Sequence, residues 1–157
     1  SESIRNNIAF GSESASDVKI RSVAKSAALL DDIKEFPDGL ETILGERGIT
    51  LSGGQKQRVS IARGIISDPN ILIFDDCLSA VDVETEEYIL LELNKIMENK
   101  TTIIVSHRVS SIKHADNIIV LDEGIIKESG NHSSLLAYDS LYSKLYHQQL
   151  LEEQAAT

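Results

Sequence analysis

The chain has 157 residues and a formal net charge of −10, which argues against nucleic acid or an anionic membrane surface as its main partner. Its single cysteine, Cys77, excludes an intrachain disulfide, and no apolar run approaches the ~20 residues that a membrane span needs. The length fits one domain or part of one. Because the sequence begins with Ser1 and not with Met, we expect a piece of a larger polypeptide.

The first 50 residues predict a small, mostly helical part. A short capped turn at 1–11 is followed by helical patterns at 17–30 and 31–36. The turn tripeptide at 37–39 ends the second pattern, and 40–50 is expected to be a loop.

Residues 52–76 predict a helix followed by a strand. The helix covers about 52–67, and the strand at 71–74 is apolar at every position, which favours burial on both faces of a parallel sheet. A helix of this length spans ~24 Å. The strand returns ~20 Å. We therefore expect Ser52 and Asp76 to face the same side of the domain.

The rest of the chain alternates between helical and strand patterns. Strands are expected at 101–105 and 117–121, with a hairpin from the latter to 125–128. Helices are expected at 83–97, at 109–114, near 133 and, as an amphipathic helix with Leu141, Leu145 and Leu150, at the C-terminus. This order predicts an α/β fold with parallel strands, in which ligands bind beyond the carboxyl ends of the strands.

Two stretches carry the functional signal. In Leu51-Ser52-Gly53-Gly54-Gln55 a hydroxyl, two glycines and an amide lie at a predicted helix start, where unpaired N–H groups attract phosphate. Taken alone this would be an ordinary capped turn. With the strand at 71–74 that ends in Asp75-Asp76, it resembles the signature motif and Walker B strand of ATP-binding cassette (ABC) ATPases. The resemblance implies a partial P-loop NTPase domain, with a helical subdomain portion at 1–50 and the α/β core at 51–157.

The resemblance also implies roles for single residues. Ser52, Gly53, Gly54 and Gln55 would contact the γ-phosphate of ATP held by the opposing domain. Asp75 would hold Mg²⁺ through water, although a strand-end cap is the alternative. His107 matches the switch histidine at the γ-phosphate, where a surface histidine is the ordinary interpretation. Asp82 matches the D-loop aspartate that reaches across a dimer, and it could equally cap the next helix.

Asp76 departs from the family, which usually has glutamate here to polarise the attacking water. An aspartate carboxylate retreats by ~1 Å, and misplacement of that size can cost ~10²-fold in rate. This predicts a slow site that mainly binds ATP, as in the degenerate site of heterodimeric exporters. We interpret Arg58 and Arg63 as helix-surface residues and Cys77 as a packing residue.

Parts of the family's machinery do not occur in the sequence. Gly48 and Gly53 have the spacing of a phosphate loop, but Gly54-Gln55 follows in place of Lys-Ser/Thr. The Q-loop, the adenine-stacking aromatic and the strand leading into the phosphate loop are also absent. We therefore expect open sheet edges and an uncovered face, and an isolated piece that is inactive and self-associates. The stretches 3–11 and 43–48 resemble exporters, the latter in the segment that senses the membrane-domain coupling helices. Glu46 and Arg47 within it could equally form a solvated charge pair.

The predicted function is an ATP-hydrolysing motor of an ABC exporter, with ATP and Mg²⁺ as cofactors. Its expected partners are a second nucleotide-binding domain, in a different chain, and the transmembrane domains at the cytoplasmic face of the cell membrane. The alternative is an ABC-type ATPase of DNA repair or chromosome maintenance. The acidic charge and the absence of heptads before Leu51 argue against that alternative.

Overall fold

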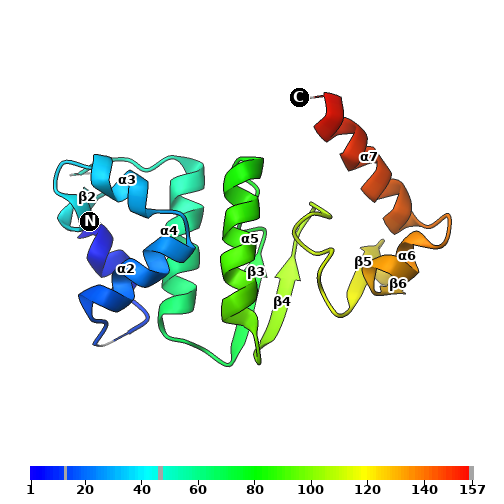
Figure 1. The fold of residues 1–157 in the computed structure, drawn as a ribbon, viewed down its shortest axis with the longest axis horizontal. Coiled ribbons are helices and arrows are strands. Elements are labelled where there is room, and N and C mark those ends of the chain that lie inside the picture. The colour runs from blue at the N-terminus through cyan, green and yellow to red at the C-terminus, as the bar shows by residue number, and fades with distance from the viewer. Residues whose placement is uncertain (13, 46–47, 156–157) are drawn as a thin grey trace. The chain divides into compact units, whose positions relative to one another are not determined.

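The computed structural model describes residues 1–12, 14–45 and 48–155 and divides the chain into two compact units. The first unit runs from Ser1 to Val105 and the second from Ser106 to Thr157. Figure 1 shows the elements of each unit in chain order. Glu46 and Arg47, for which the sequence leaves two interpretations open, lie outside the described residues. The functional division at residue 50 rests on the resemblance and stays a prediction.

Two helices of the first unit begin at serine caps. Ser3 precedes α1 (Ile4–Ala9), and Ser16 precedes α2 (Asp17–Ser26). Each hydroxyl accepts a bond from the backbone N–H three residues further on, at 3.2 and 3.3 Å. These bonds satisfy donors that a helix start otherwise leaves unpaired, so the local sequence is sufficient to place both starts.

Helix α2 ends earlier than the predicted bound at residue 30. Ala28 adopts a left-handed φ of 53°, which an α-helix cannot contain. The N–H of Leu29 then donates to the carbonyl of Ala24 at 2.8 Å and closes the helix end. Helix α3 (Leu30–Glu35) starts at once in a new direction.

The predicted loop at 40–50 contains regular structure. A 3₁₀ turn, η1 (Gly39–Glu41), leads into strand β2 (Ile43–Leu44). Strand β2 pairs antiparallel with β1 (Glu2–Ser3), which lies far away in the sequence. Local periodicity did not predict a two-residue strand whose hydrogen-bond partner is non-local.

The first unit contains a parallel strand pair with a crossover helix. Helix α4 (Gly53–Ile66) leads into β3 (Ile71–Asp75), and α5 (Val83–Met97) connects β3 to β4 (Thr101–Val105). The two strands pair in parallel over their full length. This confirms the predicted α/β class and places the residues that follow β3 and β4 at one edge of this sheet.

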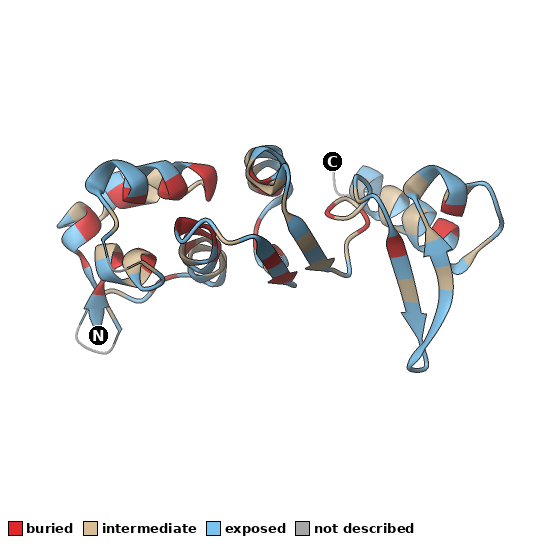
Figure 2. Cartoon of the chain, turned by 90° about the horizontal axis from the view of Figure 1, so that it is seen from below, coloured by how far each residue is buried: buried red, intermediate tan, exposed pale blue. Residues whose placement is uncertain are grey.

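One face of this sheet is not covered, as expected for a piece that lacks the strand leading into the phosphate loop, whereas the prediction that the strand at 71–74 is buried on both faces is wrong. Leu72 and Phe74 are 4% and 5% exposed, whereas Ile71 and Ile73 are 61% and 66% exposed. Figure 2 colours the chain by how far each residue is buried. The same face of β4 exposes half of two further apolar residues, Ile103 and Val105. None of the described segments of the first unit packs on this face, although its residues are those of a covered one.

The second unit contains an antiparallel hairpin. Strands β5 (Ile118–Asp122) and β6 (Ile125–Gly130) pair with each other, and the two residues between them, Glu123 and Gly124, have φ values of 50° and 76°. Two left-handed residues are typical of a tight hairpin turn, as predicted. The strand expected at 117–121 therefore belongs to its own sheet, and 109–114 forms turns instead of the expected helix.

Two helices complete this unit, α6 (His132–Leu136) and α7 (Leu141–Ala155). Tyr142 on α7 is 1% exposed and packs with Val109, Ile118 and Leu135. The predicted apolar face is not the buried one, since Leu141 and Leu145 are 45% and 41% exposed. Tyr146, one turn further along α7, packs against the same cluster, so the side of the helix that faces the core carries tyrosines and not the three leucines. Among the helices described in either unit, none is both long and apolar enough to cross a bilayer.

The uncovered sheet face predicts that the isolated chain self-associates, because exposed apolar strands favour association. Replacing Ile73 and Ile103 together by threonine should lower the association state without changing helix content. Sedimentation velocity at several concentrations, with far-ultraviolet circular dichroism, measures both quantities. Val18→Thr is the matched control, because Val18 is 79% exposed on α2. A monomeric parent chain at high micromolar concentration would contradict the prediction.

Candidate functional site

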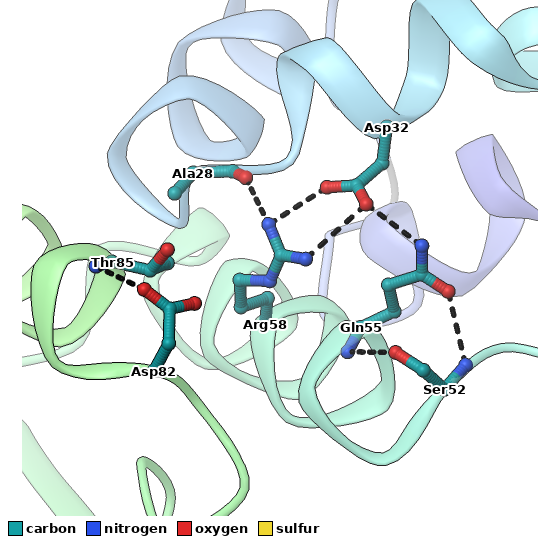
Figure 3. Close-up of polar contacts among 7 residues, drawn as sticks. All are labelled: Ala28, Asp32, Ser52, Gln55, Arg58, Asp82 and Thr85. Atoms are coloured by element: carbon teal, nitrogen blue, oxygen red, sulfur yellow. Dashed lines mark hydrogen bonds and ion pairs between the residues drawn. The ribbon is translucent and has the colours of Figure 1, made fainter. Parts of the chain in front are cut away.

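Helix α4 begins at Ser52 with a capping box (Figure 3). The Ser52 hydroxyl accepts the N–H of Gln55 at 3.2 Å, and the Gln55 side-chain carbonyl accepts the N–H of Ser52 at 3.0 Å. Ser52 and Gly53 are exposed, while Gly54 and Gln55 are half-buried. An exposed helix start with glycine in its first turn gives an anion close access to backbone N–H groups.

A partly buried ion pair holds this helix start against α3. Arg58 donates to the two oxygens of Asp32 at 2.7 and 3.2 Å, and it also donates to the carbonyl of Ala28 (Figure 3). The side chains of Arg58 and Asp32 are only 15% and 17% exposed. The interpretation of Arg58 as a helix-surface residue is therefore wrong. Two nitrogens of the planar guanidinium donate to the two oxygens of one carboxylate, and this bidentate geometry fixes the relative orientation of the two side chains.

Asp32 has a second partner in the signature stretch. The side-chain amide of Gln55 donates to one Asp32 oxygen at 2.7 Å, so that carboxylate binds both Gln55 and Arg58.

Arg63 is likewise not a free surface residue. It donates to the backbone and side-chain oxygens of Asn7, both at 2.9 Å, and its guanidinium lies 5.6 Å from the centre of the Phe10 ring. Two arginines thus attach α4 to the helices that precede it.

The carboxylates that follow β3 lie on a sharp turn. Asp75 is exposed at the carboxyl end of the strand, and Asp76 is half-buried with a left-handed φ of 47°. The N–H of Asp76 donates to the carbonyl of Val105 on β4 at 2.9 Å. Aspartate tolerates this conformation better than most residues, and the bond to β4 fixes the turn to the sheet.

Asp82 caps helix α5. Its carboxylate accepts the N–H of Thr85 at 2.9 Å, and this bond holds the pKa of the Asp82 carboxyl below its usual range. The capping interpretation is therefore confirmed, and Asp82 remains exposed at the loop. The expected contact across a dimer stays a prediction.

The helix start and this loop touch each other. A Cβ on Gly54 would lie 2.7 Å from the carbonyl oxygen of Ala80, and a Cβ on Gly53 would lie 3.4 Å from the Ala80 side chain. Position 54 therefore requires glycine for a packing reason as well as for access to an anion. This contact confirms that the start of α4 and the turn after β3 lie on one side of the unit. Gln57, which the sequence analysis did not single out, also bonds to this loop.

His107 belongs to the second unit. Its backbone carbonyl accepts a bond from the side-chain amide of Gln149 at 2.7 Å. The carbonyl of the same amide accepts the N–H of Val109 at 2.8 Å. One glutamine on α7 therefore braces the exposed His107 segment from both sides.

The donors present fit a Mg²⁺ ion that arrives with a nucleotide. Among the described residues, no group of three or more His, Cys, Asp and Glu side chains is arranged to hold a metal by itself. Asp75 offers one exposed carboxylate, and Mg²⁺ commonly takes one or two carboxylates together with waters and phosphate oxygens. The neighbouring Cys77 is half-buried, and burial raises the pKa of its thiol to about 11, so it is a packing residue without a metal-binding thiolate.

Comparison with known proteins agrees with this geometry. A family model of ABC transporters matches residues 2–79. The uncharacterized ABC transporter ATP-binding protein YknU of Bacillus subtilis (strain 168) is 51% identical over 146 residues, which are 93% of this chain and 25% of that protein. An ATP-dependent lipid A-core flippase of Desulfotalea psychrophila is 46% identical over 148 residues, covering 94% of this chain and 26% of the flippase.

A solved structure is similar to nearly the whole chain. The structure of a bacterial Atm1-family ABC exporter with ATP bound matches with a TM-score of 0.89 and 44% identity, over 95% of this chain and 26% of the exporter chain. The chain therefore spans about a quarter of the length of the relatives that it matches. The motifs, the fold and these similarities together show that the chain belongs to the ABC transporter family and forms part of its ATP-binding domain.

Proposed function

We propose that this chain is the carboxyl-terminal part of the motor domain of an ABC exporter, which couples ATP binding and hydrolysis to export across a membrane. The observation that carries the proposal is the exposed start of α4, held by Gly54 against the loop that follows the carboxylate-tipped strand β3. These two elements supply the kinds of group that phosphoryl transfer needs, one that binds phosphate and one that positions water. The relatives are named as flippases and exporters, so we do not retain the DNA-repair alternative.

The complete motor would consist of two such domains arranged head to tail. Ser52, Gly53, Gly54 and Gln55 then serve the ATP held by the partner domain, and Asp82 reaches across the dimer. The transmembrane domains of the transporter would place the pair at the cytoplasmic face of the membrane. The support is the accessibility of the helix start. Ser52 and Gln55 form hydrogen bonds with each other there, with Ser52 exposed and Gln55 half-buried.

The chain's own site would be slow. Asp75 would hold Mg²⁺ through water, Asp76 would orient the attacking water, and His107 would contact the γ-phosphate. Because Asp76 is one methylene shorter than the family's glutamate, its carboxylate falls short of the water by ~1 Å. An intact signature stretch beside a short carboxylate favours a heterodimer, in which this chain completes the competent site of a different partner chain.

Replacing Ser52 by alanine in the complete transporter should reduce turnover at the partner's site. A hydrogen bond to a charged group contributes roughly 1.5–3 kcal/mol, which predicts a loss of about tenfold to a hundredfold in the ATPase rate. Ser16→Ala is the matched control, because it removes an equivalent cap bond at the start of α2. Both variants should lose similar thermal stability. Equal ATPase rates in the two variants would contradict the proposed role of Ser52 at the partner's site.

Replacing Asp76 by glutamate should raise turnover at this chain's own site by up to ~10²-fold, because the longer side chain restores the reach to the water. Single-turnover hydrolysis in the complete transporter, with the partner's site disabled, measures this rate. Asp31→Glu adds the same methylene at a side chain that is 92% exposed, and it should change nothing. An unchanged rate in Asp76→Glu would contradict the slow-site assignment.

The isolated chain should bind Mg·ATP weakly or not at all, since its sequence contains no phosphate loop. Isothermal titration of the chain with Mg·ATP measures this directly. The Ile73→Thr, Ile103→Thr variant provides a sample in which self-association does not compete with binding. Micromolar affinity in that sample would show that the residues present suffice for a nucleotide site.

A further inference from the structure

The side-chain amide of Gln57 makes three hydrogen bonds, all to the loop that follows β3. Its nitrogen donates to the backbone carbonyl of Asp76 at 3.1 Å and to the hydroxyl of Ser79 at 2.9 Å. Its oxygen accepts the backbone N–H of Ala80 at 2.9 Å. Gln57 lies on α4, one turn beyond the capped start at Ser52.

The chemistry of the partners determines which way this amide points. A backbone carbonyl can only accept and a backbone N–H can only donate, so the amide nitrogen must face Asp76 and its oxygen must face Ala80. The Ser79 hydroxyl accepts from the amide and donates its own proton to the Asp76 carbonyl at 3.1 Å. The amide is thus fully matched to the loop, and a residue with another donor pattern would not be.

Two of these bonds fix the backbone carbonyl of Asp76. Its N–H is held by the carbonyl of Val105, while its carbonyl accepts from both Gln57 and Ser79. Asp76 has a left-handed φ of 47°, a conformation that persists only where surrounding contacts enforce it. Because the direction of a Cα–Cβ bond follows from the backbone, these contacts also aim the Asp76 carboxylate.

The same amide joins two parts that would serve different nucleotide sites. Gly54 packs against the carbonyl of Ala80 on one side of the contact, and Gln57 bonds to the Ala80 N–H on the other. The start of α4 and the loop between Asp76 and Asp82 therefore form one body. A displacement of either part would have to break a matched set of hydrogen bonds.

We propose that Gln57 is a positioning residue, which sets the direction of the residue-76 carboxylate and makes the signature helix and the D-loop move together. This inference rests on the proposed function of both elements. It predicts that losing the amide lowers the rate of ATP hydrolysis at this chain's own site without weakening nucleotide binding, since Gln57 is not among the residues expected to touch the nucleotide.

The test uses the complete transporter in the Asp76→Glu background, where the carboxylate reaches the water. Gln57→Met keeps the side-chain length and removes all three bonds. It should lower the raised hydrolysis rate of the Asp76→Glu variant by about tenfold or more, while the KM for ATP stays within about twofold. Ser60→Ala is the matched control, because it removes an exposed hydroxyl from α4 that bonds only to the Lys56 carbonyl of its own helix. It should leave the gain intact.

Gln57→Glu supplies a second readout that a purely structural loss would not produce. Its carboxylate would face the Asp76 carbonyl without a proton to donate, whereas a protonated carboxyl could restore that bond. Repulsion from the Asp76 carbonyl should raise the pKa of this introduced carboxyl, so the rate relative to the parent should recover by severalfold as the pH falls from 8 to 6. This readout decides the matter if Gln57→Met fails to fold.

The outcomes separate the two proposals. Without a gain from Asp76→Glu alone, the slow-site assignment fails before Gln57 is tested. If the gain appears and survives in Gln57→Met, the positioning role is overturned. It is also overturned if the rate of Gln57→Glu relative to its parent is independent of pH. A cancelled gain with unchanged KM and a pH-dependent recovery supports it.

Discussion

The backbone of Gly54 lies against the carbonyl oxygen of Ala80, at a distance where a Cβ would approach to 2.7 Å. Since real side chains do not make such contacts, this position accepts only glycine, and the start of α4 can come fully up to the loop after β3. The close distance between the signature stretch and the loop after β3 follows from this approach. If α4 were moved outward, Gln57 would lose its bonds to the loop and the turn at Asp76 would lose one of its supports.

The other side of α4 is held in a different way. Arg58 and Gln55 both donate to Asp32 on α3, and Arg63 donates to Asn7 on α1. Helix α4 is therefore clamped between the preceding helices through charged groups and the sheet edge through neutral hydrogen bonds. A helix fixed on both sides can transmit a displacement from one part to the other, which the proposed motor function would require.

Much of the fold could be predicted because its causes are local. The bounds of α5 and β4 follow from helical and strand periodicity, and Ser52 caps α4 because of its neighbours in sequence. The pairing of β1 with β2 could not be predicted, since each is two residues long and its partner is distant. The roles of Arg58 and Gln57 were missed for the same reason, because their partners lie on α3 and in the loop after β3.

The sequence by itself determined the family, the helix start at Ser52, the carboxylate-tipped strand and the short side chain at position 76, because each of these is a pattern of adjacent residues. Only the tertiary structure decided that Gly54 is needed for packing, that Arg58 is an anchor and that Gln57 holds the turn at Asp76. It also decided which residues of β3 lie on the exposed face, since burial depends on which segments are present to cover a strand. The physical reason is that a side chain's donors and its volume acquire partners only when distant segments meet.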